Sequence, residues 1–436
     1  MPREIVVLAG IAFCVALGYG ILAPALPVFA RLFGVSAFLA SAIISLFAVM
    51  RFVGSPLAGA LINRIGERIV LASGLIIVAV SSLIAGLSQS YVQLLILRGI
   101  GGVGSAMFTV SAMALMLRTA PPELRGRAAG VFSAGFLLGG IAGPAVGGIV
   151  VGWSIRAPFF IYAGTLALAT AVTLIFLTKP SAYEAELEAA GFDEEGIQPE
   201  DSSEVQEIEQ ENPQATSSDS PAESDISNSF LRALKNGAYR AVLMANFTNG
   251  FVAFGIRMSL VPLFVVESLH RGAGLSGVGF LVAAVAQGLF LWPAGKLADF
   301  RGRRPAVILG CLLTGIGMLA IALSVEPILF LVGMGVVGVG TAFLGSAPAA
   351  VVGDITHGRK GGNVVAGFQM ISDFGAIIGP LLAGVMADYI GYHWALGSGV
   401  VVALLALLFA VVMPETKPDQ DDVSEPSDVK IGKMGT

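Results

Sequence analysis

The stretch Gly295-Lys-Leu-Ala-Asp-Phe-Arg-Gly-Arg-Arg304 is short, basic and bounded by glycine, and it lies between two long apolar runs. A degraded copy, Gly59-Ala-Leu-Ile-Asn-Arg-Ile-Gly-Glu-Arg68, lies 236 residues earlier. The same offset places Arg98–Ala106 on Met334–Ala342, and a related offset of 235 places Gly20–Pro27 on Gly255–Pro262. These matches indicate two copies of one unit, a plan known from membrane proteins that bind a solute between their two halves.

The composition predicts an all-α integral membrane protein. Of 436 residues, 55% are hydrophobic and 13% charged, and the mean hydropathy is +0.83. A helix of about 20 apolar residues crosses the roughly 30 Å of a bilayer's hydrocarbon core. Twelve such runs are expected at residues 5–33, 37–62, 69–88, 91–117, 127–151, 156–177, 239–268, 273–298, 305–324, 327–352, 363–387 and 392–413. They predict two pseudo-symmetric six-helix bundles.

Charge patterning predicts the domains and the orientation. We expect an N-terminal bundle at 1–180, an acidic disordered linker at 181–238, a C-terminal bundle at 239–413 and a tail at 414–436. Residues 181–231 hold 15 of the 30 acids and no Lys or Arg, so this segment cannot bury enough apolar surface to fold. Eleven basic residues follow the even-numbered spans of the two halves, against three at the opposite ends. The positive-inside rule therefore predicts cytoplasmic termini and a cytoplasmic linker.

The sequence gives no sign of a cofactor, a metal or an enzymatic site. Cys14 and Cys311 lie within apolar runs, and His270, His357 and His393 lack the spacing of metal ligands. A nucleotide-binding Gly-x-x-x-x-Gly-Lys-Ser/Thr loop is also missing. We therefore expect neither enzymatic activity nor nucleic-acid binding, and expect a proton gradient or a solute gradient as the source of energy.

The motifs together resemble those of the major facilitator superfamily. The stretch 295–304 resembles the signature loop of this family, and Arg98 with Gly102 and Ala106 resembles its helix 4 motif. Gly139–Gly148 resembles the helix 5 motif, and Gly20–Pro27 the helix 1 pattern, of the twelve-span drug:proton antiporters. The resemblance implies alternating access, and a monomer in the plasma membrane that exchanges protons for an amphipathic small molecule or drug, that is, multidrug efflux.

The resemblance also implies moving parts. Asp299 is expected to face the start of helix 5, and Asn63, which replaces the usual Asp, the start of helix 11, closing the cytoplasmic side. Glu67 stands where the family usually has Arg, so we expect the N-terminal loop to close more weakly. The expected gating residues are Gly59, Asn63, Arg64, Gly66, Gly295, Asp299, Arg301, Gly302 and Arg303. The expected residues of the helices between the halves are Gly139, Gly143, Pro144, Gly147, Gly379 and Pro380.

Four charges lie deep in apolar runs: Arg51, Arg98, Arg257 and Asp373. Ionisable residues at such depth are costly and are functional candidates by default. Arg51 and Asp373 both lie roughly 15–18 Å from the cytoplasmic ends of their helices. We predict that they form an ion pair that protonation of Asp373 could break, with a permanent structural pair as the alternative. Arg98 has a part in proton coupling by the resemblance.

Further polar and aromatic residues could line a cavity. Arg257 could attract an anionic substrate group or pair with Asp373. The remaining candidates are Asn249, Phe254, Tyr19, Gln287 and Gln369. Helix 1 lacks the acid that many proton-coupled drug exporters carry, and two alternatives to efflux stay open. One is proton symport of a sugar, organic acid or other metabolite; the other is a membrane scaffold or sensor that does not transport.

Overall fold

The computed structural model describes residues 3–120, 124–177, 233–356 and 362–416, and these residues are almost entirely helical. The N-terminal half comprises α1 (Arg3–Leu22), α2 (Leu26–Arg31), α3 (Ala37–Ile65), α4 (Glu67–Gly86), α5 (Tyr91–Thr119), α6 (Arg125–Trp153) and α7 (Ala157–Phe176). The C-terminal half comprises α11 (Gly237–Asn249), η3 (Gly250–Ile256), α12 (Arg257–Leu263), η4 (Phe264–Ser268), α13 (Gly274–Arg301), α14 (Arg303–Ala322), α15 (Pro327–Thr356), α16 (Gly362–Ile390) and α17 (Tyr392–Val412).

Twelve helices in the described ranges are long and apolar enough to cross a membrane, which confirms the predicted fold class. The segments α11, η3, α12 and η4 form one continuous span, Gly237–Ser268, in which η3 and η4 are π-helical. It is the seventh span in chain order and is called the helix 7 span, distinct from α7. The expected first span, 5–33, is instead broken at residues 23–25 between α1 and α2. Pro24 and Pro27 explain the break, because proline cannot donate the backbone hydrogen bond that continues a helix.

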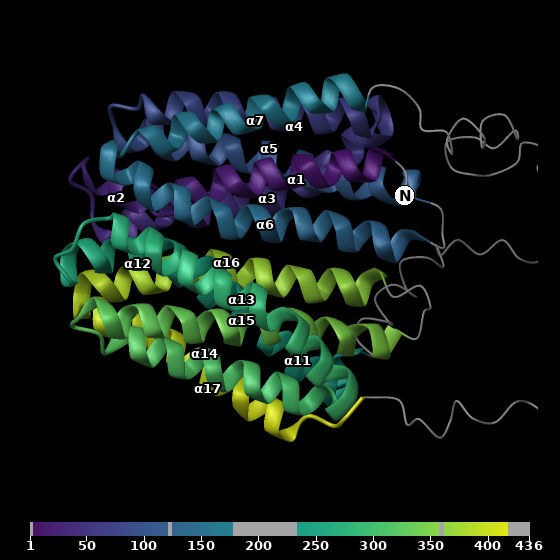
Figure 1. The fold of residues 1–436 in the computed structure, drawn as a ribbon, viewed down its shortest axis with the longest axis vertical. Helices are drawn as coiled ribbons and strands as arrows, with labels where there is room; N and C mark the ends of the chain where they lie inside the picture. The colour runs from purple at the N-terminus through teal and green to yellow at the C-terminus, as the bar shows by residue number, and fades with distance from the viewer. Residues whose placement is uncertain (1–2, 121–123, 178–232, 357–361, 417–436) are drawn as a thin grey trace, which may run out of the picture.

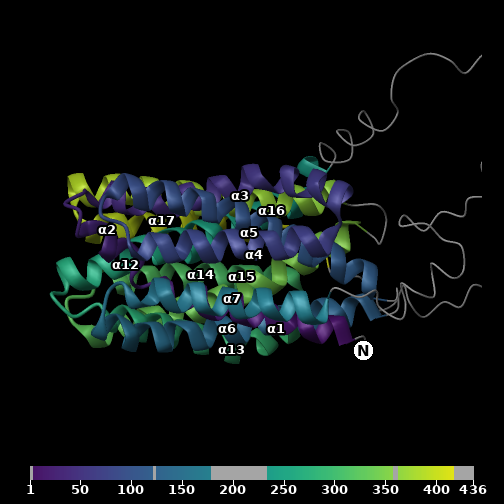
Figure 2. The ribbon, with the colours of Figure 1, turned by 90° about the horizontal axis from the view of Figure 1, so that it is seen from above.

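Figure 1 shows the N-terminal half above the C-terminal half, and the long helices run roughly parallel in both views (Figures 1 and 2). The start of α1, the end of α7, the start of α11 and the end of α17 all lie at one end of the bundle, which we call the linker end (Figure 1). The opposite end, where α1 meets α2 and α16 meets α17, is called the far end. Most of the segment predicted to be disordered, 181–238, lies within 178–232, which is outside the described residues. The domain boundaries therefore stay a prediction.

Both halves use the same packing scheme, as two copies of one unit require. In the N-terminal half α3 and α4 pack on α5, and α4 packs on α7; in the C-terminal half α13 and α14 pack on α15, and α14 packs on α17. The halves meet where α3 packs on α16 and where α6 packs on α13. The site between the halves is therefore bounded by these four helices together with the helix 7 span.

Glycine makes the tight turn in both signature loops. Gly66 ends α3 with φ of 81°, and Gly302 ends α13 with φ of 111°. A side chain is strained at such positive φ, whereas glycine adopts it freely. The next helix starts at the following residue in both places, so the predicted short turns are confirmed.

Candidate functional site

An ion pair joins the two halves in the interior. Nη2 of Arg51 on α3 lies 2.5 Å from Oδ1 of Asp373 on α16. Their side chains are 38% and 21% exposed, so the pair is partly shielded yet reachable by water. The ion pair predicted from equal depth in two helices is confirmed.

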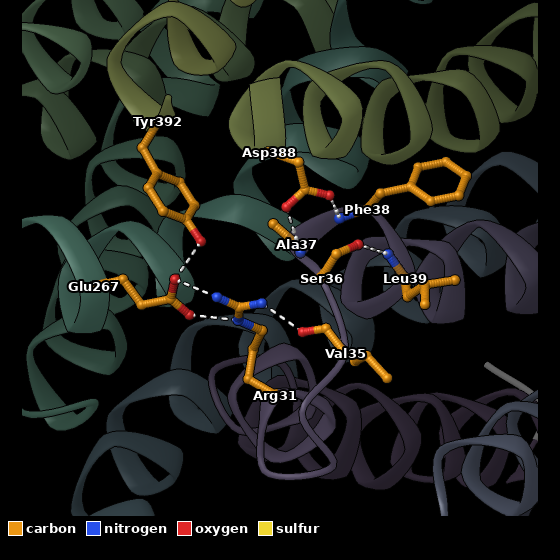
Figure 3. Close-up of polar contacts among 9 residues, drawn as sticks. All are labelled: Arg31, Val35, Ser36, Ala37, Phe38, Leu39, Glu267, Asp388 and Tyr392. Carbon is orange, nitrogen blue, oxygen red and sulfur yellow. Dashed lines mark hydrogen bonds and ion pairs between the residues drawn. The ribbon is translucent and has the colours of Figure 1, made fainter. Parts of the chain in front are cut away.

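A second network joins the halves at the far end (Figure 3). Nε and Nη2 of Arg31 donate to the two carboxylate oxygens of Glu267 at 2.6 and 2.8 Å. The Tyr392 hydroxyl donates to the same carboxylate at 2.8 Å, and Arg31 also donates to the carbonyl oxygen of Val35. The hydrogen bond to Glu267 raises the pKa of the Arg31 guanidinium above its ordinary value, although desolvation opposes this, so the pair stays charged.

Asp388 extends this network to the start of α3. Its two carboxylate oxygens accept hydrogen bonds from the backbone N–H groups of Ala37 and Phe38, at 2.8 and 2.9 Å (Figure 3). The first N–H groups of a helix have no partner within the helix, and the helix dipole favours a negative charge there. The end of α16 therefore supplies the N-terminal cap of a helix in the other half.

Sequence reasoning missed Glu267, Asp388 and Tyr392, and it treated Arg31 only as a charge that sets topology. One signal was available: Arg31 and Glu267 are 236 residues apart, which is the offset between the signature loops and differs by one residue from the offset of 235 for the neighbouring Gly20–Pro27. The two residues therefore occupy nearly equivalent positions and carry opposite charges. Equivalent positions meet near the axis that relates two copies, so such a couple predicts a contact between the halves.

At the linker end, the signature loops form ion pairs within one half. Glu67 pairs with Arg118 at 3.3 Å in the N-terminal half, and Arg303 pairs with Asp354 at 3.1 Å in the C-terminal half. Glu67 lies 236 residues before Arg303, and Arg118 lies 236 residues before Asp354, so each position carries the opposite charge in the other half. Glu67, which departs from the family pattern, therefore pairs with Arg118 at the position where Arg303 pairs with Asp354 in the other half, with the two charges exchanged.

Asp299 lies in the same loop and bonds to Arg303 at 2.5 Å, with 67% of its side chain exposed. Glu415 accepts hydrogen bonds from the N–H groups of Arg303 and Arg304 at 2.7 and 3.1 Å and so caps α14. Asn63 is exposed. In this conformation, Asp299 and Asn63 make no hydrogen bond to the other half among the described residues, so their closing role stays a prediction.

The glycine face expected between the halves lies elsewhere. A Cβ at Gly139 would be 2.5 Å from the carbonyl oxygen of Phe13, and one at Gly147 would be 2.7 Å from that of Ile21, so these glycines and Gly143 pack on α1. Gly379 likewise packs on Phe251 and Gly255 of the helix 7 span, together with Pro380. The prediction was right about the helices but wrong about their faces.

Other glycines form the contact between the halves. A Cβ on Gly148 of α6 would be 3.1 Å from Cα of Gly277 on α13, whose own Cβ would be 2.7 Å from the Gly148 nitrogen and 3.1 Å from the Pro144 carbonyl oxygen. On α16 the corresponding residue is Gly384, which lies against Phe38. Successive residues are about 100° apart around a helix, so Gly148 faces a different neighbour from Gly147.

Two arginines are buried. Arg98 is 1% exposed, and its guanidinium carbon lies 4.5 Å from the Phe47 ring centroid, close enough for a cation–π interaction. The Tyr19 ring stacks on Phe47, with the two ring centroids 6.2 Å apart. Arg257 is 9% exposed and donates no hydrogen bond to any residue in the described ranges. It does not pair with Asp373, because Asp373 already bonds to Arg51.

The remaining cavity candidates are placed less closely. Phe254 is 52% exposed although it belongs to the helix 7 span, the most buried of the twelve. Asn249 and Gln287 are half-buried and Gln369 is exposed, and the structure gives no mutual contact among these three in the described residues. No cluster of metal-ligating side chains is present among the described residues.

Comparisons with known proteins agree with this geometry. The model of the Major Facilitator Superfamily matches residues 8–237 and 242–432. The chain is 27% identical to Multidrug resistance protein 2 of Bacillus subtilis, over 95% of the chain and 96% of that protein. It is 25% identical to the human synaptic vesicular amine transporter, over 83% of the chain but only 63% of that protein. A D-xylose–proton symporter structure has a TM-score of 0.67 at 19% identity, covering 96% of the chain and 99% of the symporter.

Proposed function

We propose that this protein exports amphipathic small molecules in exchange for protons. The chain belongs to the major facilitator superfamily and is therefore a multi-pass membrane transporter rather than an enzyme. Likeness over nearly the whole length to Multidrug resistance protein 2 supports efflux of drug-like molecules. In this proposal the protein acts as a monomer in the lipid bilayer of the plasma membrane.

The linker end faces the cytoplasm in this proposal. The excess of Lys and Arg in the loops at that end supports the orientation, since cytoplasmic loops of membrane proteins are enriched in both. Side-chain bonds between the halves at the far end, through Glu267 and Asp388, support an inward-facing state closed to the outside. Substrate would enter the space between the halves from the cytoplasm, beside Phe254 and the other candidates.

The Arg51–Asp373 pair is the observation that carries the proposal, because it couples a titratable group to the contact between the halves. Protonation of Asp373 neutralises the carboxylate and removes most of the attraction to Arg51, so α3 and α16 are freer to separate there. A proton taken up from the outside would be released to the cytoplasm when the pair re-forms. Substrate moves in the opposite direction in the other half of the cycle.

Three groups support this cycle. Arg98, fixed on Phe47 and near Tyr19, would hold a positive charge close to the proton pathway. The signature loops would close the cytoplasmic side in the outward-facing state, with Asp299 leaving Arg303 for the first N–H groups of α6. The glycine contact between α6 and α13 would allow the halves to tilt about a smooth surface.

The direction of the proton gradient tests the proposal. The purified full chain is reconstituted in liposomes, and uptake of lipophilic cations, sugars and organic acids is measured with an acidic lumen, an acidic exterior and no pH difference. Antiport predicts that a lipophilic cation accumulates with an acidic lumen and loses this accumulation when a protonophore is added. Accumulation of a sugar or organic acid with an acidic exterior would instead establish symport, and no flux of any compound would favour a scaffold or sensor.

A further inference from the structure

Arg257 is a buried charge that has no partner among the residues that the structure describes. It lies at the start of α12, between the π-helical segments η3 and η4. Its Nε and Nη1 atoms are buried and unbonded, and the guanidinium donates no hydrogen bond within the described residues. A guanidinium in such surroundings is costly unless an anion or a set of acceptors replaces water.

The nearby acids are already in use. Asp373 bonds to Arg51, Glu267 binds Arg31 and Tyr392, and Asp388 caps α3. These are the acids on the C-terminal elements that lead to or flank the helix 7 span, apart from those at the linker end and the exposed Glu326 before α15. Arg257 cannot gain a carboxylate partner from them without breaking a contact between the halves.

Arg98 is the other buried arginine to compare, and its Nε and Nη1 atoms also have no hydrogen-bond partner in the described residues. Its guanidinium lies over the Phe47 ring, which offsets part of the lost hydration. In the described residues Arg257 has neither an aromatic ring beneath it nor a hydrogen-bond acceptor. The two buried arginines therefore differ in one contact, the Phe47 ring that Arg98 has and Arg257 does not, so a bound anion would offset more of the lost hydration at Arg257.

The helix around Arg257 is irregular in a way that suits a ligand. Gly250–Ile256 and Phe264–Ser268 have wide π-helical turns, which occur frequently at functional sites. Pro262 lies between them and leaves the carbonyl oxygen one turn earlier without its usual N–H donor. The unusual backbone places Arg257 on a segment that packs on α2, α3 and α16, next to the junction of α3 and α16.

We propose that the Arg257 guanidinium is an anion-binding site for a compact monovalent anion. The anion is either a free halide or a carboxylate carried by a transported molecule, since the planar guanidinium binds both and pairs with a carboxylate through two parallel hydrogen bonds. Bound there, the anion neutralises the charge that the closed far end buries and so stabilises the inward-facing state. This site goes beyond the proposed proton exchange and does not depend on Asp373.

Anion-dependent stability tests the site without a transport assay. The full chain is purified in detergent in sodium sulfate, whose divalent anion lies outside the proposed class, and its thermal unfolding midpoint is followed during titration with sodium chloride or sodium benzoate at constant ionic strength. The expected result is a saturable rise of several degrees in the wild type. A rise with chloride identifies a free halide as the ligand, and a rise with benzoate alone identifies a carboxylate. An identical midpoint in all three salts would refute the site.

Two variants assign the effect to Arg257. Arg257→Gln is expected to remove the anion dependence, whereas Arg98→Gln, which removes the other buried arginine, is expected to keep it. Retention of the full effect in Arg257→Gln would refute the assignment. If Arg257→Gln does not fold, Arg257→Lys serves instead, because it keeps the charge but loses the paired hydrogen bonds. It should need a several-fold higher benzoate concentration, and an unchanged titration would contradict the proposal.

Discussion

The contacts between the two halves differ between the two ends of the molecule. At the far end, a Cβ on Gly148, Gly277 or Gly384 would press on the opposite half. Toward the linker end of the same four helices, a Cβ on Gly59, Gly130 or Gly295 would meet nothing within 4 Å. The backbones of the two halves are therefore packed closely at the far end, whereas these three linker-end glycines make no such contact.

Charges show the same contrast. Arg31, Glu267 and Asp388 make their bonds across the boundary at the far end. The pair Glu67–Arg118 at the linker end stays in one half, and so does its charge-reversed equivalent in the other half. The far-end bonds must break when the protein opens outward, whereas the linker-end pairs can persist. Substitutions in the far-end bonds should therefore change the conformational equilibrium, and substitutions in these two linker-end pairs should change mainly stability.

Gly277→Val should have the largest effect. The new side chain would displace the backbone of Gly148, so the far end could not close, and substrate flux should fall more than tenfold. Spin labels at Leu32 and Leu323, both exposed at the far end, should move apart in a background without Cys14 and Cys311. Gly152→Ala is the matched control on α6, since its Cβ meets nothing, and it should leave the distance unchanged. A normal distance in Gly277→Val would refute the packing at this end.

Asp388→Asn should have an intermediate effect. Asparagine brings no charge and only one acceptor oxygen for the two N–H groups of α3, and a charge-assisted hydrogen bond contributes about 1.5–3 kcal/mol. The population that is open at the far end should therefore rise on the order of tenfold, measured with the same spin labels. Asp354→Asn is the control, because it removes an acid whose bonds stay within the C-terminal half. An equal rise in both variants would remove the distinction between the two ends.

Reversing Glu67 and Arg118 should have the smallest effect. Glu67→Arg with Arg118→Asp reproduces the charges found at Arg303 and Asp354, so the double variant should be close to wild type. Each single change should lower stability, with a coupling energy below about 1 kcal/mol because such partly exposed pairs are weak. A double-mutant cycle on thermal unfolding measures this coupling, and no recovery in the double variant would show that the two halves are not interchangeable here.

Much of the fold could be read from the sequence because the repeat offset and the apolar runs are properties of the chain alone. The Arg51–Asp373 pair was also predictable. The two residues lie at equal depth on two helices that were expected to pack together, and a buried charge has few possible partners at that depth. The glycine faces were not, because a stripe such as Gly139–Gly147 marks a close neighbour without saying which one, and α1 and α13 both lie beside α6. Asp388 was missed because capping a helix of the other half depends on where two helix ends meet.

The role of Asp373 is the central claim, and transport by Asp373→Asn tests it most directly. Liposomes containing wild type or Asp373→Asn are compared in two assays: accumulation of a lipophilic cation driven by an acidic lumen, and exchange of labelled for unlabelled cation without a pH difference. We predict that the variant loses the proton-driven accumulation and keeps the exchange, because substrate can still cross without a titratable carboxylate. Proton-driven accumulation at the wild-type level would contradict the account and make Arg51–Asp373 a structural ion pair.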